Sequence, residues 1–163
     1  MMAVALLPIF ERLQHTYLGE TIRHSATLIA TLEIVHLIGL TLLLGTIVMV
    51  DLSLIGLGIG SHPVSRIARE LANWTIAGLA IMLASGPLIL ISEAVKCYKT
   101  PAFWIKMVLL AIALVFHFTI HRKATLAEPP VPRLDAWLVA SISLALWTGV
   151  ALAGKAIAIF QPG

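Results

Sequence analysis

Cysteine is almost absent from this sequence, and its scarcity excludes several kinds of chemistry. Cys97 is the one cysteine among 163 residues. A lone thiol forms no intramolecular disulfide, no CxxC redox pair and no cysteine-rich metal site. The CxxCH motif of covalently attached c-type haem is missing as well. Membrane thiol oxidoreductases and c-type cytochromes are therefore excluded.

Charged residues are also scarce. They make up 12% of the chain, about half the share typical of a soluble domain. Hydrophobic residues make up 60%, and the mean hydropathy is +0.99. A domain of this size leaves too much surface in water to hide that much apolar area, so the composition predicts a membrane protein. The 11 basic and 8 acidic residues form no basic patch, so we expect a lipid bilayer and no nucleic acid as partner.

Four long apolar runs predict four membrane-spanning helices. A bilayer core of ~30 Å requires roughly 20 mostly apolar residues in a helix. The predicted spans are about 25–50, 74–91, 102–120 and 134–154. We expect one membrane domain over residues 1–163, an all-α up-down bundle of four transmembrane helices.

Residues 1–20 predict an N-terminal interfacial helix. Leu6, Phe10, Leu13 and Tyr17 recur at helical spacing between polar residues, a pattern typical of an amphipathic helix on a membrane surface. No positive residue precedes the apolar stretch, so we expect no signal peptide. Four spans place both termini on one side. That side carries six basic residues and the other carries five, which leaves the orientation open.

Ionisable residues inside the predicted spans are the candidates for function. A charge at mid-bilayer costs roughly 2.5–3.5 kcal/mol, and Glu33, His36 and His117 fall within spans. His36 and His117 are on alternate spans, which run in the same direction. Counted from the span starts, their imidazoles are predicted at similar depth, within about one helical turn. We therefore expect His36 and His117 to supply both axial nitrogens of one haem b per chain.

Neighbouring residues are assigned supporting roles. Glu33 lies three residues before His36 and is predicted to accept a hydrogen bond from its outer ring nitrogen, or to serve a proton path. Lys106, near the start of the third span, or Arg122, at its opposite end, is expected to pair with a haem propionate. Electron transfer or redox and gas sensing follows, with a quinone or a redox protein as partner.

Two alternatives remain open. The first is copper or other metal handling through His36, His117 and His121, with help from a methionine. The second is a non-catalytic assembly subunit or a proton or ion transport subunit. No nucleophile–base constellation or phosphate-binding loop occurs, so any enzymatic role is that of an oxidoreductase or electron-transfer component. A stripe of small residues in the last span can support a homo-oligomer.

Four stretches carry a resemblance to a known family. They are residues 31–40 (TLEIVHLIGL), 45–52 (GTIVMVDL), 63–71 (PVSRIAREL) and 101–107 (PAFWIKM). Over residues 20–155 the chain resembles a family of small bacterial four-span membrane proteins of unassigned function. More distantly it is similar to copper-resistance D-type proteins and to the haem-bearing gamma subunits of respiratory enzymes. The resemblance implies a bacterial inner (cytoplasmic) membrane, with the histidines His36 and His117 as ligands of b-type haem or copper.

Overall fold

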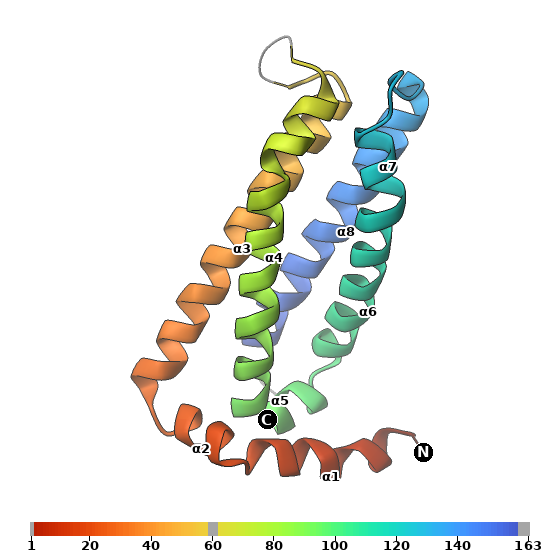
Figure 1. The fold of residues 1–163 in the computed structure, drawn as a ribbon. Coiled ribbons are helices and arrows are strands. Elements are labelled where there is room, and N and C mark those ends of the chain that lie inside the picture. The colour runs from red at the N-terminus through yellow and green to blue at the C-terminus, as the bar shows by residue number, and fades with distance from the viewer. Residues whose placement is uncertain (1, 59–61, 160–163) are drawn as a thin grey trace.

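Four long helices form the body of the protein. The computed structural model describes residues 2–58 and 62–159, and the regular elements within these residues are helices. The long ones are α3 (Ala26–Leu54), α4 (Val64–Ser92), α6 (Pro101–Phe116) and α8 (Arg133–Ile159). α6 continues through the π-helical segment η1 (His117–His121) into α7 (Arg122–Thr125). Four helical stretches are long and apolar enough to cross a membrane, and they stand side by side in Figure 1. The predicted four-helix membrane bundle is confirmed.

The second span begins earlier than predicted. The sequence places its start at Trp74, whereas α4 begins at Val64. Arg66 pairs with Glu70 one turn further on, at 2.8 Å, so charged side chains stabilise the first turns. At 1.5 Å per residue, the 29 residues of α4 extend about 43 Å, well beyond a bilayer core of ~30 Å. Hydropathy marks only the part of the helix that lies in lipid.

The N-terminal segment forms two short helices, where one was predicted. They are α1 (Met2–Gln14) and α2 (Tyr17–Arg23), and both lie across one end of the bundle in Figure 1. Thr16 begins α2, because its hydroxyl accepts a hydrogen bond from the backbone N–H of Gly19 at 3.2 Å. The side chain of Gln14 anchors α1 to α5 (Ala94–Lys99) by accepting the backbone N–H of Val95 at 2.9 Å.

The bundle consists of two close helix pairs. α3 packs along α4, α6 packs along α8, and contacts between α3 and α8 join the pairs. At the α3–α4 crossing, a Cβ atom on Gly78 would lie 2.7 Å from the backbone nitrogen of Leu43, so the two backbones are in direct contact. Among the described residues, no comparably extensive contact joins α4 to α6. The bundle is therefore least closed on that side.

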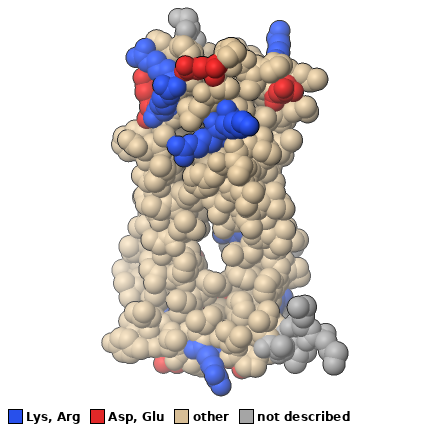
Figure 2. All heavy atoms as spheres, turned by 45° about the vertical axis from the view of Figure 1, so that its right-hand side comes forward, with Lys and Arg blue, Asp and Glu red and all other residues tan. Residues whose placement is uncertain are grey.

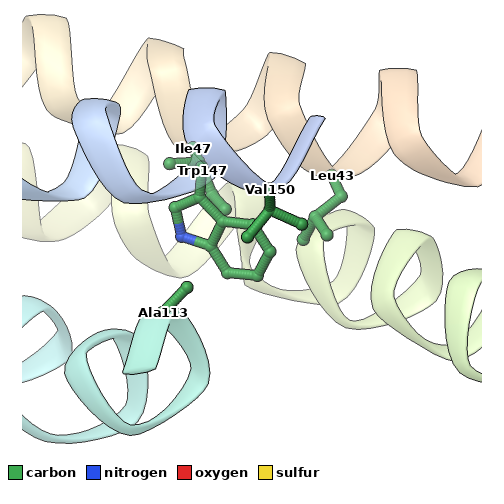
Figure 3. Packing of buried hydrophobic residues seen from close by; sticks show 5 residues of the cluster. All are labelled: Leu43, Ile47, Ala113, Trp147 and Val150. Atoms are coloured by element: carbon green, nitrogen blue, oxygen red, sulfur yellow. The ribbon is translucent and has the colours of Figure 1, made fainter. Parts of the chain in front are cut away.

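An apolar cluster fills the middle of the bundle, as Figure 3 shows. It comprises Leu43 and Ile47 of α3, Ala113 of α6, and Trp147 and Val150 of α8, each at most 2% exposed. Burial of this apolar surface fixes the helices against one another.

The outer surface is that of a protein in lipid. Large apolar side chains are exposed along the long helices, among them Ile38, Val115 and Leu138. On the face shown in Figure 2, most charged residues lie toward the two ends of the molecule, and the surface between them is largely uncharged. The chain is a multi-pass membrane protein.

Candidate functional site: two polar layers inside the bundle

His36 points into the bundle, and Ser85 determines which ring nitrogen carries its proton. His36 lies seven and eleven residues before the buried Leu43 and Ile47, so the three share one face of α3. Its Nδ1 atom is 2.8 Å from Ser85 Oγ, which is also 2.6 Å from the carbonyl oxygen of Ile81. The one hydroxyl hydrogen of Ser85 goes to that carbonyl, since a carbonyl only accepts. Ser85 therefore accepts a hydrogen bond from Nδ1–H of His36, which leaves a lone pair on Nε2.

The Nε2 atom of His36 is accessible. It has no hydrogen-bond partner among the described residues, and it is not a buried atom. Gly86, the neighbour of Ser85, lies beside the ring, where a Cβ atom would come within 3.4 Å of Cε1. Gly86 therefore packs against the Cε1–Nδ1 edge of the ring, and Nε2 is the ring nitrogen without a partner among the described residues.

Lys106 faces the same interior at the same height. It lies four and seven residues before Leu110 and Ala113, on the inward face of α6. A Cβ atom on Gly154 would lie 3.3 Å from its Nζ. The ammonium has no ion pair or hydrogen bond with the described residues and is not buried from solvent, and its charge acts on His36.

Together these residues form a lower polar layer, to which each long helix contributes. Its members are His36 of α3, Ser85 of α4, Lys106 of α6 and Gly154 of α8. Gly86 and Gly154 have no side chains at this height, whereas side chains fill the interior at the height of the apolar cluster. Figure 2 shows an opening between the helices in the lower half of the molecule, with Lys or Arg atoms at its edge.

An upper polar layer lies near the other end of the bundle. Asp51 of α3 and His121 of η1 are 0% and 3% exposed, and Oδ1 of Asp51 is 2.7 Å from Nε2 of His121. The ring of His117 is stacked on that of His121, with centroids 5.0 Å apart and planes 22° apart. Both histidines belong to the π-helical segment, an irregularity frequently found at functional sites.

Several buried atoms of the upper polar layer lack hydrogen-bond partners. They are Asp51 Oδ2, His117 Nδ1, Ser143 Oγ and Trp147 Nε1. The rings of Trp147 and His117 are 6.2 Å apart, and Ser143 precedes Trp147 by one turn of α8. Unpaired buried polar atoms are uncommon in folded proteins, so this layer has unused capacity to bind a proton or a small polar species.

The prediction that His36 and His117 lie at similar depth is wrong. The Asp51–His121 bond fixes the register of α3 and α6. His36 lies 15 residues before Asp51, and His117 lies four residues before His121. The difference of 11 residues places the two imidazoles about 16 Å apart along the bundle.

The apolar cluster occupies the height between these imidazoles, since Leu43, Ile47 and Ala113 lie between them in this register. Two axial ligands of one iron bind the same atom from opposite sides of a porphyrin, so their ring nitrogens must lie close together. The geometry therefore does not fit a haem held by both His36 and His117.

The supporting residues are also rearranged. Glu33 is exposed and makes no hydrogen bond to His36, whose Nδ1–H is taken by Ser85. Arg122 is exposed and follows the upper polar layer. Of the two alternative propionate partners, Lys106 is the one at the height of His36. It precedes His121 by 15 residues, the same number that separates His36 from Asp51.

The predicted copper ligands are not brought together. His36 is in the lower polar layer, His121 is bonded to Asp51, and the stacked ring planes of His117 and His121 do not converge on one point. Within residues 2–58 and 62–159, no group of three or more His, Cys, Asp or Glu side chains is arranged to hold a metal ion.

Asp51 and Ser85 are the site residues that the sequence analysis missed. Asp51 was interpreted as the residue at which the first span stops, but α3 continues to Leu54. A signal was present, because Asp51 and His121 both occur near the ends of predicted spans on the side opposite the termini. Ser85 carried no such signal, since a serine in an apolar helix usually bonds to its own backbone.

Comparison with known proteins places the chain within one family. A family model described as "Family of unknown function (DUF6644)" matches residues 9–160. No curated protein and no solved structure matches the chain. The more distant resemblance to copper-resistance D-type proteins and haem-bearing gamma subunits stays a prediction.

Proposed function

The chain belongs to the family of unknown function DUF6644, and we propose that it is a membrane-embedded b-type haem protein that uses His36 as its protein ligand. The Nε2 atom of His36 carries this proposal. It holds a lone pair, its ring is oriented by Ser85, and it is not a buried atom. A neutral imidazole whose second nitrogen donates a hydrogen bond is the usual form of a metal-binding histidine.

The other members of the lower polar layer suit the same ligand. Gly86 and Gly154 place no side chains in this layer, so the ring of His36 and the ammonium of Lys106 lie directly beside the backbones of α4 and α8. Lys106 carries a positive charge inside a membrane helix with no counter-charge among the described residues, a costly arrangement in lipid. A propionate would supply that counter-charge, so we assign Lys106 to propionate binding.

His36 is the one described histidine at this height, which favours a single protein ligand. A haem bound in this way supplies an iron with an open coordination position, able to bind a diatomic gas or to exchange an electron. We therefore favour gas or redox sensing over electron transfer between two histidine-bound haems. We place the protein in a bacterial inner membrane, with a redox protein or quinone as the source of electrons.

Absorption spectroscopy tests the proposal. The full chain is expressed with haem supplied, purified in detergent, and measured oxidised, dithionite-reduced and after addition of carbon monoxide. We expect a Soret band that shifts with carbon monoxide. His36→Ala should bind about tenfold less haem per protein than the wild type, or less still. His117→Gln should bind as much as the wild type, because His117 is about 16 Å from His36 along the bundle. Imidazole added to His36→Gly should restore the band.

Ser85→Ala tests whether the hydroxyl positions His36. We expect haem affinity to fall by roughly 10–100-fold, the usual effect of losing the hydrogen bond that orients a ligand. Ser143→Ala is the matched control, because Ser143 is buried in the other polar layer. A colourless wild-type protein, or an unchanged spectrum in His36→Ala, would refute the proposal. A six-coordinate spectrum that requires both His36 and His117 would refute the single-ligand assignment.

A further inference from the structure

The upper polar layer has no role in the proposed haem site, and its geometry points to a second activity. We propose that Asp51, His121 and His117 form a reversible proton-binding site near one face of the membrane. In this site Asp51 and His121 share one proton, and the ring of His117 stacks on that of His121. The inference does not depend on haem binding, because the layer is separated from His36 by the apolar cluster.

The first argument is the burial of an acid–base pair. Asp51 is 0% exposed, His121 is 3% exposed, and their bonded atoms are 2.7 Å apart. An isolated carboxylate in such surroundings would be very unfavourable, so the pair exists as carboxylate with imidazolium or as carboxylic acid with imidazole. These two states differ by the position of one proton along one hydrogen bond. Release of the other ring proton, on Nδ1, leaves a carboxylate that accepts a hydrogen bond from Nε2–H of a neutral imidazole.

The second argument is access. Nδ1 of His121 has no partner among the described residues, yet it is not one of the buried atoms. A proton can therefore reach the ring at Nδ1 while Nε2 stays bonded to Asp51. Further in, His117 Nδ1 and Asp51 Oδ2 are buried without partners, and each can accept a proton or a hydrogen bond.

The third argument is that the surroundings leave these three residues as the buried titratable groups of the layer. α8 contributes Ser143 and Trp147, which do not titrate near neutral pH, and α4 contributes Thr75, bonded to Thr46 of α3. The charged groups around this end of the bundle are exposed. They are Arg66, Arg69, Glu70, Arg122, Lys123, Glu128, Arg133 and Asp135.

The apolar cluster limits where the proton can go. Leu43, Ile47 and Val150 lie below the upper polar layer and are at most 1% exposed. They offer no donor or acceptor that would carry a proton on to His36. The proposal therefore places the binding and release of the proton at one end of the bundle.

Infrared spectroscopy can follow Asp51 alone, because the chain has two aspartates, Asp51 and Asp135. In the Asp135→Asn protein, incorporation of aspartate with a ¹³C-labelled carboxyl group marks Asp51 without touching the pair. Difference spectra between pH 8 and pH 5 are recorded on the full chain in lipid nanodiscs. We expect the labelled carboxyl band to change position reversibly between the two pH values. Replacing H₂O by D₂O in the buffer should cause a further, smaller change in the position of the band.

Variants separate a proton-binding site from a purely structural pair. His121→Gln should change the pH-dependent shift of the labelled band, and His117→Gln should alter its size while the Asp51–His121 bond remains. His62→Gln is the control, because His62 is exposed, and should leave the shift unchanged. A labelled band with the same position at both pH values in the folded Asp135→Asn protein would overturn the proposal.

Discussion

Ser85 shows how one hydroxyl group determines the chemistry of a residue on another helix. Its own hydrogen goes to the Ile81 carbonyl, so His36 must donate to it through Nδ1. An alanine at this position would leave the imidazole free to adopt either tautomer. The Nε2 atom of His36 on α3 is thus an acceptor because Ser85 on α4 accepts the hydrogen bond from Nδ1–H.

Cys97 is expected to be unreactive in the folded protein. Burial in α5, together with the nearby negative charge of Glu93, raises the pKa of its thiol to about 11. Since the thiolate is the nucleophile, maleimide should modify Cys97 at pH 7.5 about tenfold or more slowly than an exposed cysteine. Tyr17→Cys in a Cys97→Ser background is the comparison, because Tyr17 is 84% exposed. Mass spectrometry of timed samples gives both rates.

The raised pKa of the Cys97 thiol also makes the stability of the folded protein fall as the pH rises. Between the ordinary pKa of 9.0 and the raised value of about 11, an unfolded chain loses the proton that the folded chain keeps. Ionisation therefore favours the unfolded state as the pH rises through this range. Cys97→Ser should lose less thermal stability between pH 8 and pH 10 than the wild type.

In the alkylation experiment, equal rates for Cys97 and for the Tyr17→Cys variant would contradict the burial of the Cys97 thiol.

At the scale of elements, the α3–α4 crossing depends on glycines that lack room for a side chain. A Cβ atom on Gly78 would approach the backbone nitrogen of Leu43 to 2.7 Å, whereas one on Gly45 would meet nothing within 4 Å. Both residues lie inside long helices. The sequence alone does not distinguish a glycine at a helix contact from one that faces lipid.

Substitution by alanine should change the stability of the protein in opposite directions at these two glycines. Gly78→Ala should destabilise the protein by about 1–3 kcal/mol, because a backbone atom cannot move aside as a flexible side chain can. Gly45→Ala should be neutral or stabilising by up to about 1 kcal/mol, because alanine favours the helix. Thermal unfolding in detergent, followed by circular dichroism, measures both. A stabilising effect of Gly78→Ala would show that the helices are not in backbone contact.

At the scale of the whole molecule, the spans could be predicted from sequence but their register could not. The apolar runs predict the four helices because transfer into lipid depends on local composition. The relative height of α3 and α6 depends on the bond between Asp51 and His121, 70 residues apart. Counting from span starts therefore placed His36 and His117 at one height, whereas in this register Lys106 lies at the height of His36. The π-helical turn at His117 had no sequence signal.

The arrangement of the ends predicts a labelling pattern. α1, α2 and the end of α8 lie at one end of the bundle, and α7 lies at the other (Figure 1). In a Cys97→Ser background, Tyr17→Cys and Lys155→Cys should react with an impermeant maleimide from the same side of the membrane. Glu128→Cys should react from the opposite side. Gel-shift assays on intact cells and inverted vesicles distinguish the two. Labelling of positions 17 and 155 from opposite sides would contradict an even number of spans.

The apolar cluster between the two polar layers has an electrical consequence. The aliphatic side chains of Leu43, Ile47 and Val150 offer no ligand to ions or water, so much of the transmembrane voltage should drop across this region. Each polar layer should then sense mainly the electrical potential of the membrane face nearest to it.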